Sequence, residues 1–308
     1  MKEERSQQIK YASWVGIIGN TFLAVLKVLI GFISGSLAVI GDGIDTLSDV
    51  LTYVITLFTA RIISKPPDPK FPYGYKKAET ISTKVLSFII FFAGAQLLIT
   101  TAGRIISQEP REMPSIIAIY VTLISILGKA ILAAWQFRMG KRAESSMIIA
   151  NAKNMRNDIL ISGSVLVGLV FTFILEMPIL DLVTGMLVSL WIIKVAFNIF
   201  QESNMELMDG VTDTEVYFKI FNAVNTIDGA RNPHRIRVRH LANMLLIAMD
   251  IEVDKDIRVI EAHDICKNVE KKLREDIPNV YDVLIHIEPE GNIEKDEVFG
   301  ISEQNINA

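Results

Sequence analysis

Six long apolar stretches constrain the fold of this chain more than any other feature. They cover residues 11–34, 37–62, 81–106, 115–138, 147–176 and 180–202 of the 308 residues. A bilayer core about 30 Å thick needs roughly 20 mostly apolar helical residues, and every stretch reaches that length. The first stretch is much longer than a signal-peptide core and ends without a small-residue cleavage site. The sequence therefore predicts a membrane α-helical domain with six spans, all of them retained.

The distribution of charge separates these spans from the rest of the chain. Residues 1–207 carry 19 Lys and Arg against 15 Asp and Glu, whereas residues 208–308 carry 12 against 20. We predict a six-helix transmembrane domain over residues 1–207, a soluble domain over 208–290 and a flexible acidic tail over 291–308. A soluble domain of about 80 residues is marginal for a core of its own, which favours pairing with a second copy.

The soluble domain shows the periodicities of helices and strands in turn. Apolar residues recur at helical spacing near 215–227 and 259–277, while 234–240, 244–253 and 281–288 resemble strands. The predicted order is α-β-β-α-β, an α+β domain with a small open sheet. Strict alternation places His234, Ile236, Val238 and His240 on one face of the first strand.

The distribution of Lys and Arg between the loops predicts the orientation of the spans. An even number of spans puts both termini on one side, and basic residues mark the cytoplasmic side. Eleven basic residues fall on the side of the termini and only Arg104 and Arg111 fall on the other. We therefore expect both termini in the cytoplasm and a multi-pass protein of the cell membrane. The eleven are Lys2, Arg5, Lys10, Arg61, Lys65, Lys70, Lys76, Lys77, Arg138, Lys141 and Arg142.

Acidic residues deep in the spans are the strongest candidates for chemistry. An ionised carboxylate at the centre of a bilayer costs about 2.5–3.5 kcal/mol on the insertion scale, so it needs a partner or a task. Asp45 and Asp49 are one helical turn apart in the second span, and Asn154 and Asp158 repeat that spacing in the fifth. These four oxygen-bearing side chains could form a cage for a divalent metal, or share protons. The alternative is that each Asp only hydrogen-bonds between helices.

The remaining charges inside the spans invite a structural interpretation. Asp42 and Lys27 lie at similar depth on either side of the tight turn at Gly35, which predicts a structural ion pair, with a role near the metal as the alternative. Lys129 and Lys194 also lie inside spans, and the sequence offers no specific partner for them.

The single cysteine, Cys266, excludes an intrachain disulfide and is expected to be a buried thiol.

Several motifs together resemble the cation diffusion facilitator family. They are SLAVIGDGIDTLSD over residues 36–49, YGYKKAE over 73–79, the span-five pair, LMD over 207–209 and the small soluble domain. The resemblance covers about residues 10–290. It implies a dimeric exporter that moves divalent metal out of the cytoplasm against proton entry, not an enzyme, with a metallochaperone-like cytoplasmic domain. It assigns the transport site to Asp45, Asp49, Asn154 and Asp158, and implies that Lys77 and Asp209 interlock the dimer.

Departures from the family pattern predict the metal. Zinc-carrying members usually have a histidine in the span-five pair, where this chain has Asn154, and no histidine lies in residues 1–207. Imidazole suits Zn²⁺, whereas carboxylate and carbonyl oxygens suit Mn²⁺, so we predict Mn²⁺. An exporter of Zn²⁺, Fe²⁺ or Co²⁺ is the alternative, and a metal-regulated cation channel is the alternative from another class. The second loop site of some members is expected to be absent, because only Asp68 remains beside Phe71 and Tyr75.

All four histidines lie in the soluble domain. The resemblance puts five residues on or beside positions that bind regulatory metal in the cytoplasmic dimer: His234, Asp250, His263, His286 and Glu288.

Without imidazole in the membrane, Asp45, Asp49 and Asp158 are the expected proton carriers. We expect no cofactor beyond transported and regulatory divalent metal. The expected partners are a second copy of the chain, metal ions, protons and membrane lipid, and no nucleic acid.

Overall fold

The computed structural model of the chain describes residues 2–107, 112–142, 146–211, 213–241, 244–292, 299–303 and 306. The chain forms two compact units, one of residues 1–61 with 82–200 and the other of residues 62–81 with 201–308. Arg111, which entered the orientation prediction, lies outside the described residues. The side chains of Lys2, Arg5 and Lys10 lie outside them as well.

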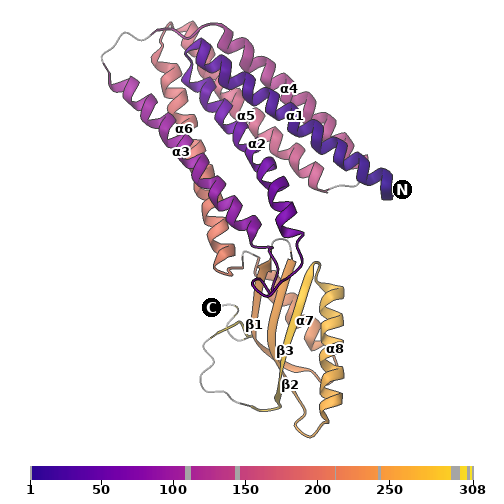
Figure 1. Cartoon of the computed structure of the whole chain (residues 1–308). Coiled ribbons are helices and arrows are strands. Elements are labelled where there is room, and N and C mark those ends of the chain that lie inside the picture. The colour runs from indigo at the N-terminus through magenta and orange to yellow at the C-terminus, as the bar shows by residue number, and fades with distance from the viewer. Residues whose placement is uncertain are drawn as a thin grey trace. The chain divides into compact units, whose positions relative to one another are not determined.

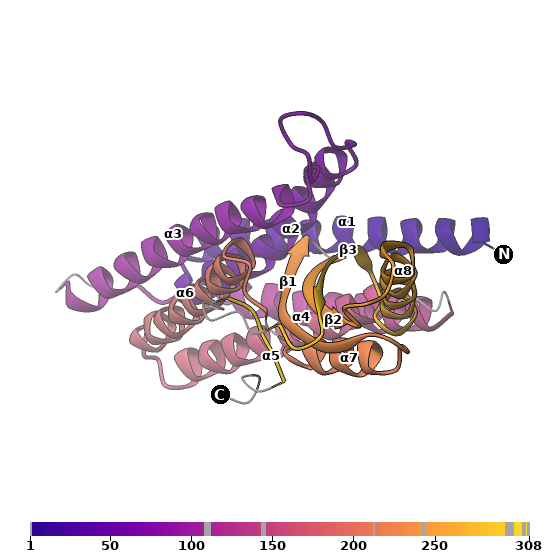
Figure 2. The same ribbon diagram turned by 90° about the horizontal axis from the view of Figure 1, so that it is seen from below.

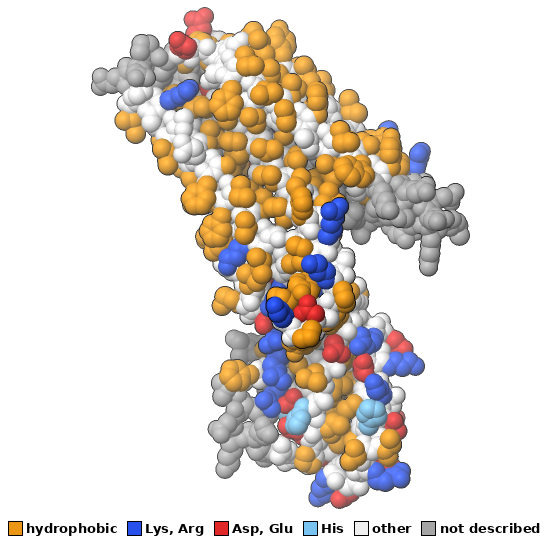
Figure 3. Space-filling view, viewed as in Figure 1, with side chains coloured by type: hydrophobic (Ala, Val, Ile, Leu, Met, Phe, Trp, Pro, Cys, Tyr) orange, Lys and Arg blue, Asp and Glu red, His pale blue; other side chains and the backbone are white. Residues whose placement is uncertain are grey.

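Long helices make up the N-terminal unit (Figure 1). Among the residues that the structure describes, six helices are long and apolar enough to cross a membrane, as predicted. Hydrophobic side chains dominate the visible surface of these helices, whereas charged side chains gather on the other unit (Figure 3). The helices are α1 (Lys2–Ser34), α2 (Leu37–Ile63), α3 (Ala78–Ile106), α4 (Ile117–Arg142), α5 (Ser146–Ile174) and α6 (Ile179–Leu207).

A tight turn and a buried acid set the start of α2. Gly35 has φ of 72°, a left-handed conformation that glycine adopts without steric cost, and it reverses the chain between α1 and α2. Asp181 of α6 accepts hydrogen bonds from Ser36 Oγ at 2.5 Å and from the Leu37 backbone N–H at 3.0 Å. The carboxylate satisfies a free N–H at the helix N-terminus. This bond ties α6 to α2, the helix that carries Asp45 and Asp49.

The C-terminal unit has the predicted order α-β-β-α-β, which is thereby confirmed. Its elements are α7 (Glu215–Asn225), β1 (Arg231–Leu241), β2 (Met244–Val253), α8 (Val259–Asp276) and β3 (Val280–Pro289). The sheet order is β1-β2-β3, with β1 antiparallel and β3 parallel to β2. Helices α7 and α8 contact each other and pack on the sheet (Figure 2). Ile247, Met249 and Ile251 of β2 belong to the core between sheet and helices, so the even-numbered residues of β2 face the opposite side.

The alternation predicted for β1 is wrong at His234. His234 pairs with Asp250, but Arg237 pairs with Ala248, so one extra residue of β1 lies between these pairs. Such a bulge moves the following side chains to the other face of the strand. Ile236 and Val238 therefore join the helix-facing core, whereas His234 faces the side of the sheet that carries Asp250. Arg235 takes up the bulge with φ of 47°.

Part of the predicted loose tail is docked on the C-terminal unit. Ile301 forms an antiparallel bridge with Ile236, through backbone hydrogen bonds of 3.0 Å and 2.9 Å. Ile301 and Ile306 also pack against the core. Two half-buried isoleucines and the free edge of β1 account for the packing of this segment.

Candidate metal sites

Helices α2 and α5 carry the candidate acidic ligands of the N-terminal unit. Asp45 and Asp49 lie one turn apart on α2, and Asp158 lies on α5. Asp49 and Asp158 meet at one point, because both carboxylates contact the ammonium group of Lys129. Asn154 lies one turn before Asp158 and its side chain is exposed. The structure thus brings two of the three predicted carboxylates together and leaves the amide at the accessible edge of α5.

A buried lysine of α4 lies among these carboxylates. Lys129 Nζ is 2.7 Å from Asp158 Oδ2 and 3.7 Å from Asp49 Oδ2. The sequence analysis found no partner for this residue. A count of the intramembrane charges could have found it, because Lys129 needs an acid once Lys27 and Asp42 are paired. Lys194, the other unassigned lysine, lies over the Trp191 ring at 5.5 Å from its centroid.

The ion pair predicted between Lys27 and Asp42 is confirmed. Lys27 Nζ is 2.8 Å from Asp42 Oδ2 and donates to Thr46 Oγ1 at 3.2 Å and Ser162 Oγ at 2.9 Å. Ser162 in turn donates to Asp42 Oδ1 at 2.7 Å. Both ionic side chains are fully buried. This network links α1, α2 and α5 one turn from Asp45, and it holds the helices that carry the candidate site.

Asp209 and Asp68, two acids singled out in the sequence, lie in the C-terminal unit. Asp209 accepts a hydrogen bond from Lys77 Nζ at 2.8 Å and also pairs with Arg239 Nε at 3.2 Å. Asp68 accepts hydrogen bonds from the Tyr75 hydroxyl and from the backbone N–H groups of Lys70 and Phe71. The bond from Tyr75, followed by the backbone bonds, lowers the pKa of Asp68. The carboxylate of Asp68 is therefore used in hydrogen bonds that stabilise the loop.

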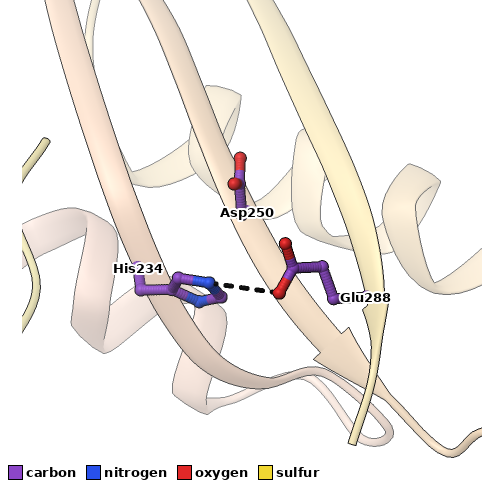
Figure 4. A group of neighbouring side chains, drawn as sticks. All are labelled: His234, Asp250 and Glu288. Carbon is purple, nitrogen blue, oxygen red and sulfur yellow. Dashed lines mark ion pairs between the residues drawn. The ribbon is translucent and has the colours of Figure 1, made fainter. Parts of the chain in front are cut away.

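The second candidate site lies on the sheet face opposite α7 and α8. His234 of β1, Asp250 of β2 and Glu288 of β3 are all buried, and a ligand atom from each lies within 4.8 Å of the others. The ring of His234 and the carboxyl group of Glu288 point toward each other across the sheet (Figure 4). The bulge in β1 creates this arrangement, because an unbroken strand would turn His234 toward the helices. One imidazole and two carboxylates form a suitable donor set for a divalent transition metal.

One hydrogen bond sets the orientation of the His234 imidazole. His234 Nδ1 lies 2.7 Å from the carbonyl oxygen of Asn232, and a carbonyl only accepts, so Nδ1 carries the proton. His234 Nε2 then faces Glu288 Oε2 at 3.4 Å. Such a second hydrogen bond is typical of metal-binding histidines. Within the described part of the chain, no hydrogen bond reaches the buried Glu288 Oε1. Asp250 pairs with Arg235 at 2.8 Å, a partner that the sequence analysis missed.

The other predicted residues of this site lie farther out. His286 aligns with Asp250 across the sheet, but its side chain is 66% exposed and its Nε2 is 3.8 Å from Glu288 Oε1. His263 is exposed on α8, and α8 covers the opposite face of the sheet. Cys266 of α8 packs at the edge of the core, where burial raises the pKa of its thiol. The structure therefore unites three of the five predicted ligands and places a fourth beside them.

Comparison with known proteins identifies the family of this chain. Residues 13–208 match the family described as "Cation efflux transmembrane domain", and residues 212–290 match "Cation efflux protein, cytoplasmic domain". The chain belongs to the cation diffusion facilitator family. It is a multi-pass membrane protein that exports divalent cations, and the family is not enzymatic. The match to the cytoplasmic domain, the dimerisation domain of these proteins, implies a homodimer.

Relatives with different printed roles share similar identity with this chain. The manganese efflux system protein MneS of Bacillus subtilis is 30% identical over 277 residues, which cover 89% of this chain and 93% of the relative. The magnetosome protein MamM of Paramagnetospirillum magneticum is 27% identical, over 83% of this chain and 81% of the relative. The metal-bound C-terminal domain of the CzcD transporter from Thermotoga maritima is 36% identical, with a TM-score of 0.25, and matches 26% of this chain and 93% of that domain.

Proposed function

We propose that this protein exports Mn²⁺ from the cytoplasm in exchange for protons. The transport site in this proposal is formed by Asp45, Asp49, Asn154 and Asp158. One observation carries the proposal: Asp49 of α2 and Asp158 of α5 converge on one point. Asp45 lies one turn before Asp49 on α2, and the only other proposed ligand is an amide. Residues 1–207 are then the transport domain, and residues 208–290 the cytoplasmic domain that binds metal and holds the dimer together.

The choice of Mn²⁺ is supported by the chemistry of the donor atoms. Carboxylate and carbonyl oxygens suit Mn²⁺, whereas imidazole favours Zn²⁺, and all four histidines lie beyond residue 207. Two relatives are named manganese efflux system proteins, at 30% and 27% identity. Magnetosome proteins MamB and MamM match at 27% as well, so identity alone does not choose the metal. Export of Zn²⁺, Fe²⁺ or Co²⁺ through the same site is the competing function.

The proposed transport cycle exchanges metal for protons at one set of carboxylates. Asp45, Asp49 and Asp158 release protons when metal enters from the cytoplasm, and external protons displace the metal after the helices rock to open outward. Both termini lie in the cytoplasm in this scheme. Metal bound by His234, Asp250 and Glu288 regulates the dimer, and His286 is placed to join them. The Lys77–Asp209 pair, reinforced by Arg239, interlocks the dimer.

Transport into proteoliposomes with an imposed pH gradient tests this function. We expect wild-type protein to accumulate Mn²⁺ only when the gradient is present, and Asn154→His to gain Zn²⁺ transport. Asn198→His is the matched control, because Asn198 is an exposed asparagine on α6 and should leave the preference unchanged. Zn²⁺ preference in the wild type would refute the Mn²⁺ assignment and keep the exporter. Metal flux that never runs uphill would instead indicate a channel.

A further inference from the structure

The transport cycle described above assigns no role to Lys129. Its side chain is 1% exposed, yet it contacts Asp158, which is 15% exposed, and Asp49, which is 42% exposed. A lysine buried in a membrane helix is costly unless it is paired, and such residues are usually functional. Lys129 therefore links α4 to both α2 and α5, through the carboxylates that the proposed function assigns to the metal.

Lys27 shows what a purely structural lysine looks like in the same unit. Its ammonium group contacts Asp42 and donates to two hydroxyl groups, and Asp42 is as completely buried as Lys27. None of these partners belongs to the proposed transport site. Lys129 differs because its two ion-pair partners are both proposed metal ligands and both reach an accessible surface. The two carboxylates can therefore exchange their contacts with Lys129 for contacts with an incoming cation.

We propose that the Lys129 ammonium group is a tethered counter-cation that occupies the metal position of the empty transport site and is displaced when metal binds. This inference rests on the proposed function. A small divalent metal bonds carboxylate oxygens at about 2.0–2.2 Å. Lys129 Nζ already lies 2.7 Å from Asp158 Oδ2 and 3.7 Å from Asp49 Oδ2. A metal bonded to both oxygens would share with the ammonium group the two carboxylates that Lys129 now contacts, and repulsion between the two cations would drive Lys129 away.

The charges of the group favour a lysine that stays near the carboxylates after the metal binds. Asp45, Asp49 and Asp158 carry three negative charges when ionised, and Lys27 cancels Asp42. A divalent metal together with a nearby Lys129 neutralises the three carboxylates. When the metal leaves, the ammonium group returns to Asp49 and Asp158, so fewer unpaired charges remain in the membrane. Lys129 thus weakens metal binding and promotes metal release, which an exporter requires.

Metal binding by the full-length dimer in detergent distinguishes this role from that of a static link between helices. We expect Lys129→Met and Lys129→Gln to bind Mn²⁺ at least about tenfold more tightly in titration calorimetry, because a like charge close to the metal is removed. In proteoliposomes both KM and kcat should fall, since the metal binds well and leaves slowly. Lys194→Met removes a lysine that contacts Trp191 instead, and it should change neither value. Unchanged or weaker Mn²⁺ binding by folded Lys129 variants would overturn the proposal.

A structure of the wild-type protein with Mn²⁺ provides a test that needs no variant. We expect Mn²⁺ between Asp49 and Asp158, with Lys129 Nζ beyond hydrogen-bonding distance of both. Mn²⁺ bound there with Nζ still in contact with Asp158 would refute displacement and leave the exporter function intact. If neither Mn²⁺ nor Zn²⁺ binds at these carboxylates and the wild type transports neither, the proposed function and this inference fail together.

Discussion

Removal of Lys27 should lower the free energy of unfolding of the transmembrane unit, because Lys27 pairs with the buried Asp42. Lys27→Met leaves the carboxylate of Asp42 without its cation in a fully buried position. Loss of one partner of a buried ion pair costs about 3–5 kcal/mol. Ser162 still donates to Asp42 Oδ1 at 2.7 Å, so we expect a loss near the lower end, about 3 kcal/mol.

A second substitution at Asp42 should reverse most of this loss. Replacement of a whole buried ion pair by apolar side chains is often neutral for stability, so Lys27→Met with Asp42→Leu should be more stable than Lys27→Met alone. The free energy of unfolding is measured by titration of the detergent-solubilised protein with a denaturing detergent. Lys194→Met serves as the control and should stay within about 0.5 kcal/mol of the wild type. The reasoning is refuted if the double variant is as unstable as the single one.

Three further predictions concern the candidate sites. Asp158→Ala should abolish metal transport in proteoliposomes while the protein stays a folded dimer by size-exclusion chromatography; transport at the wild-type rate would show that the carboxylate is not a ligand. Saturating Zn²⁺ or Mn²⁺, at about 100 times the dissociation constant, should stabilise the wild-type cytoplasmic domain within the full chain by about 2.7 kcal/mol. Glu288→Gln should lose most of that gain in thermal unfolding, His240→Gln should keep it, and equal gains in both would argue against the cluster. Asp209→Ala should weaken the dimer, because Lys77 and Arg239 lose their shared carboxylate, and an unchanged dissociation constant in analytical ultracentrifugation would contradict the interlock.

Features with a local cause could be predicted from the sequence. The length of each apolar stretch determines whether a helix can cross a bilayer, and strand and helix periodicities distinguish the elements of the C-terminal unit. The ion pair of Lys27 with Asp42 was also predictable, because the tight turn at Gly35 puts the two residues at equal depth on adjacent helices. In each case the answer depends on residues that are close together in the chain.

The partners of Lys129 and the position of His234 were decided by the tertiary structure. Which helices meet at Lys129 depends on how α2, α4 and α5 pack, and spacing along one helix carries no information about its neighbours. His234 reaches Asp250 and Glu288 because Arg235 adopts a positive φ and takes up one extra residue in β1. Alternation along a strand cannot reveal such a bulge. The sequence by itself determined which residue types were available for each site, and the long-range packing determined which of them meet.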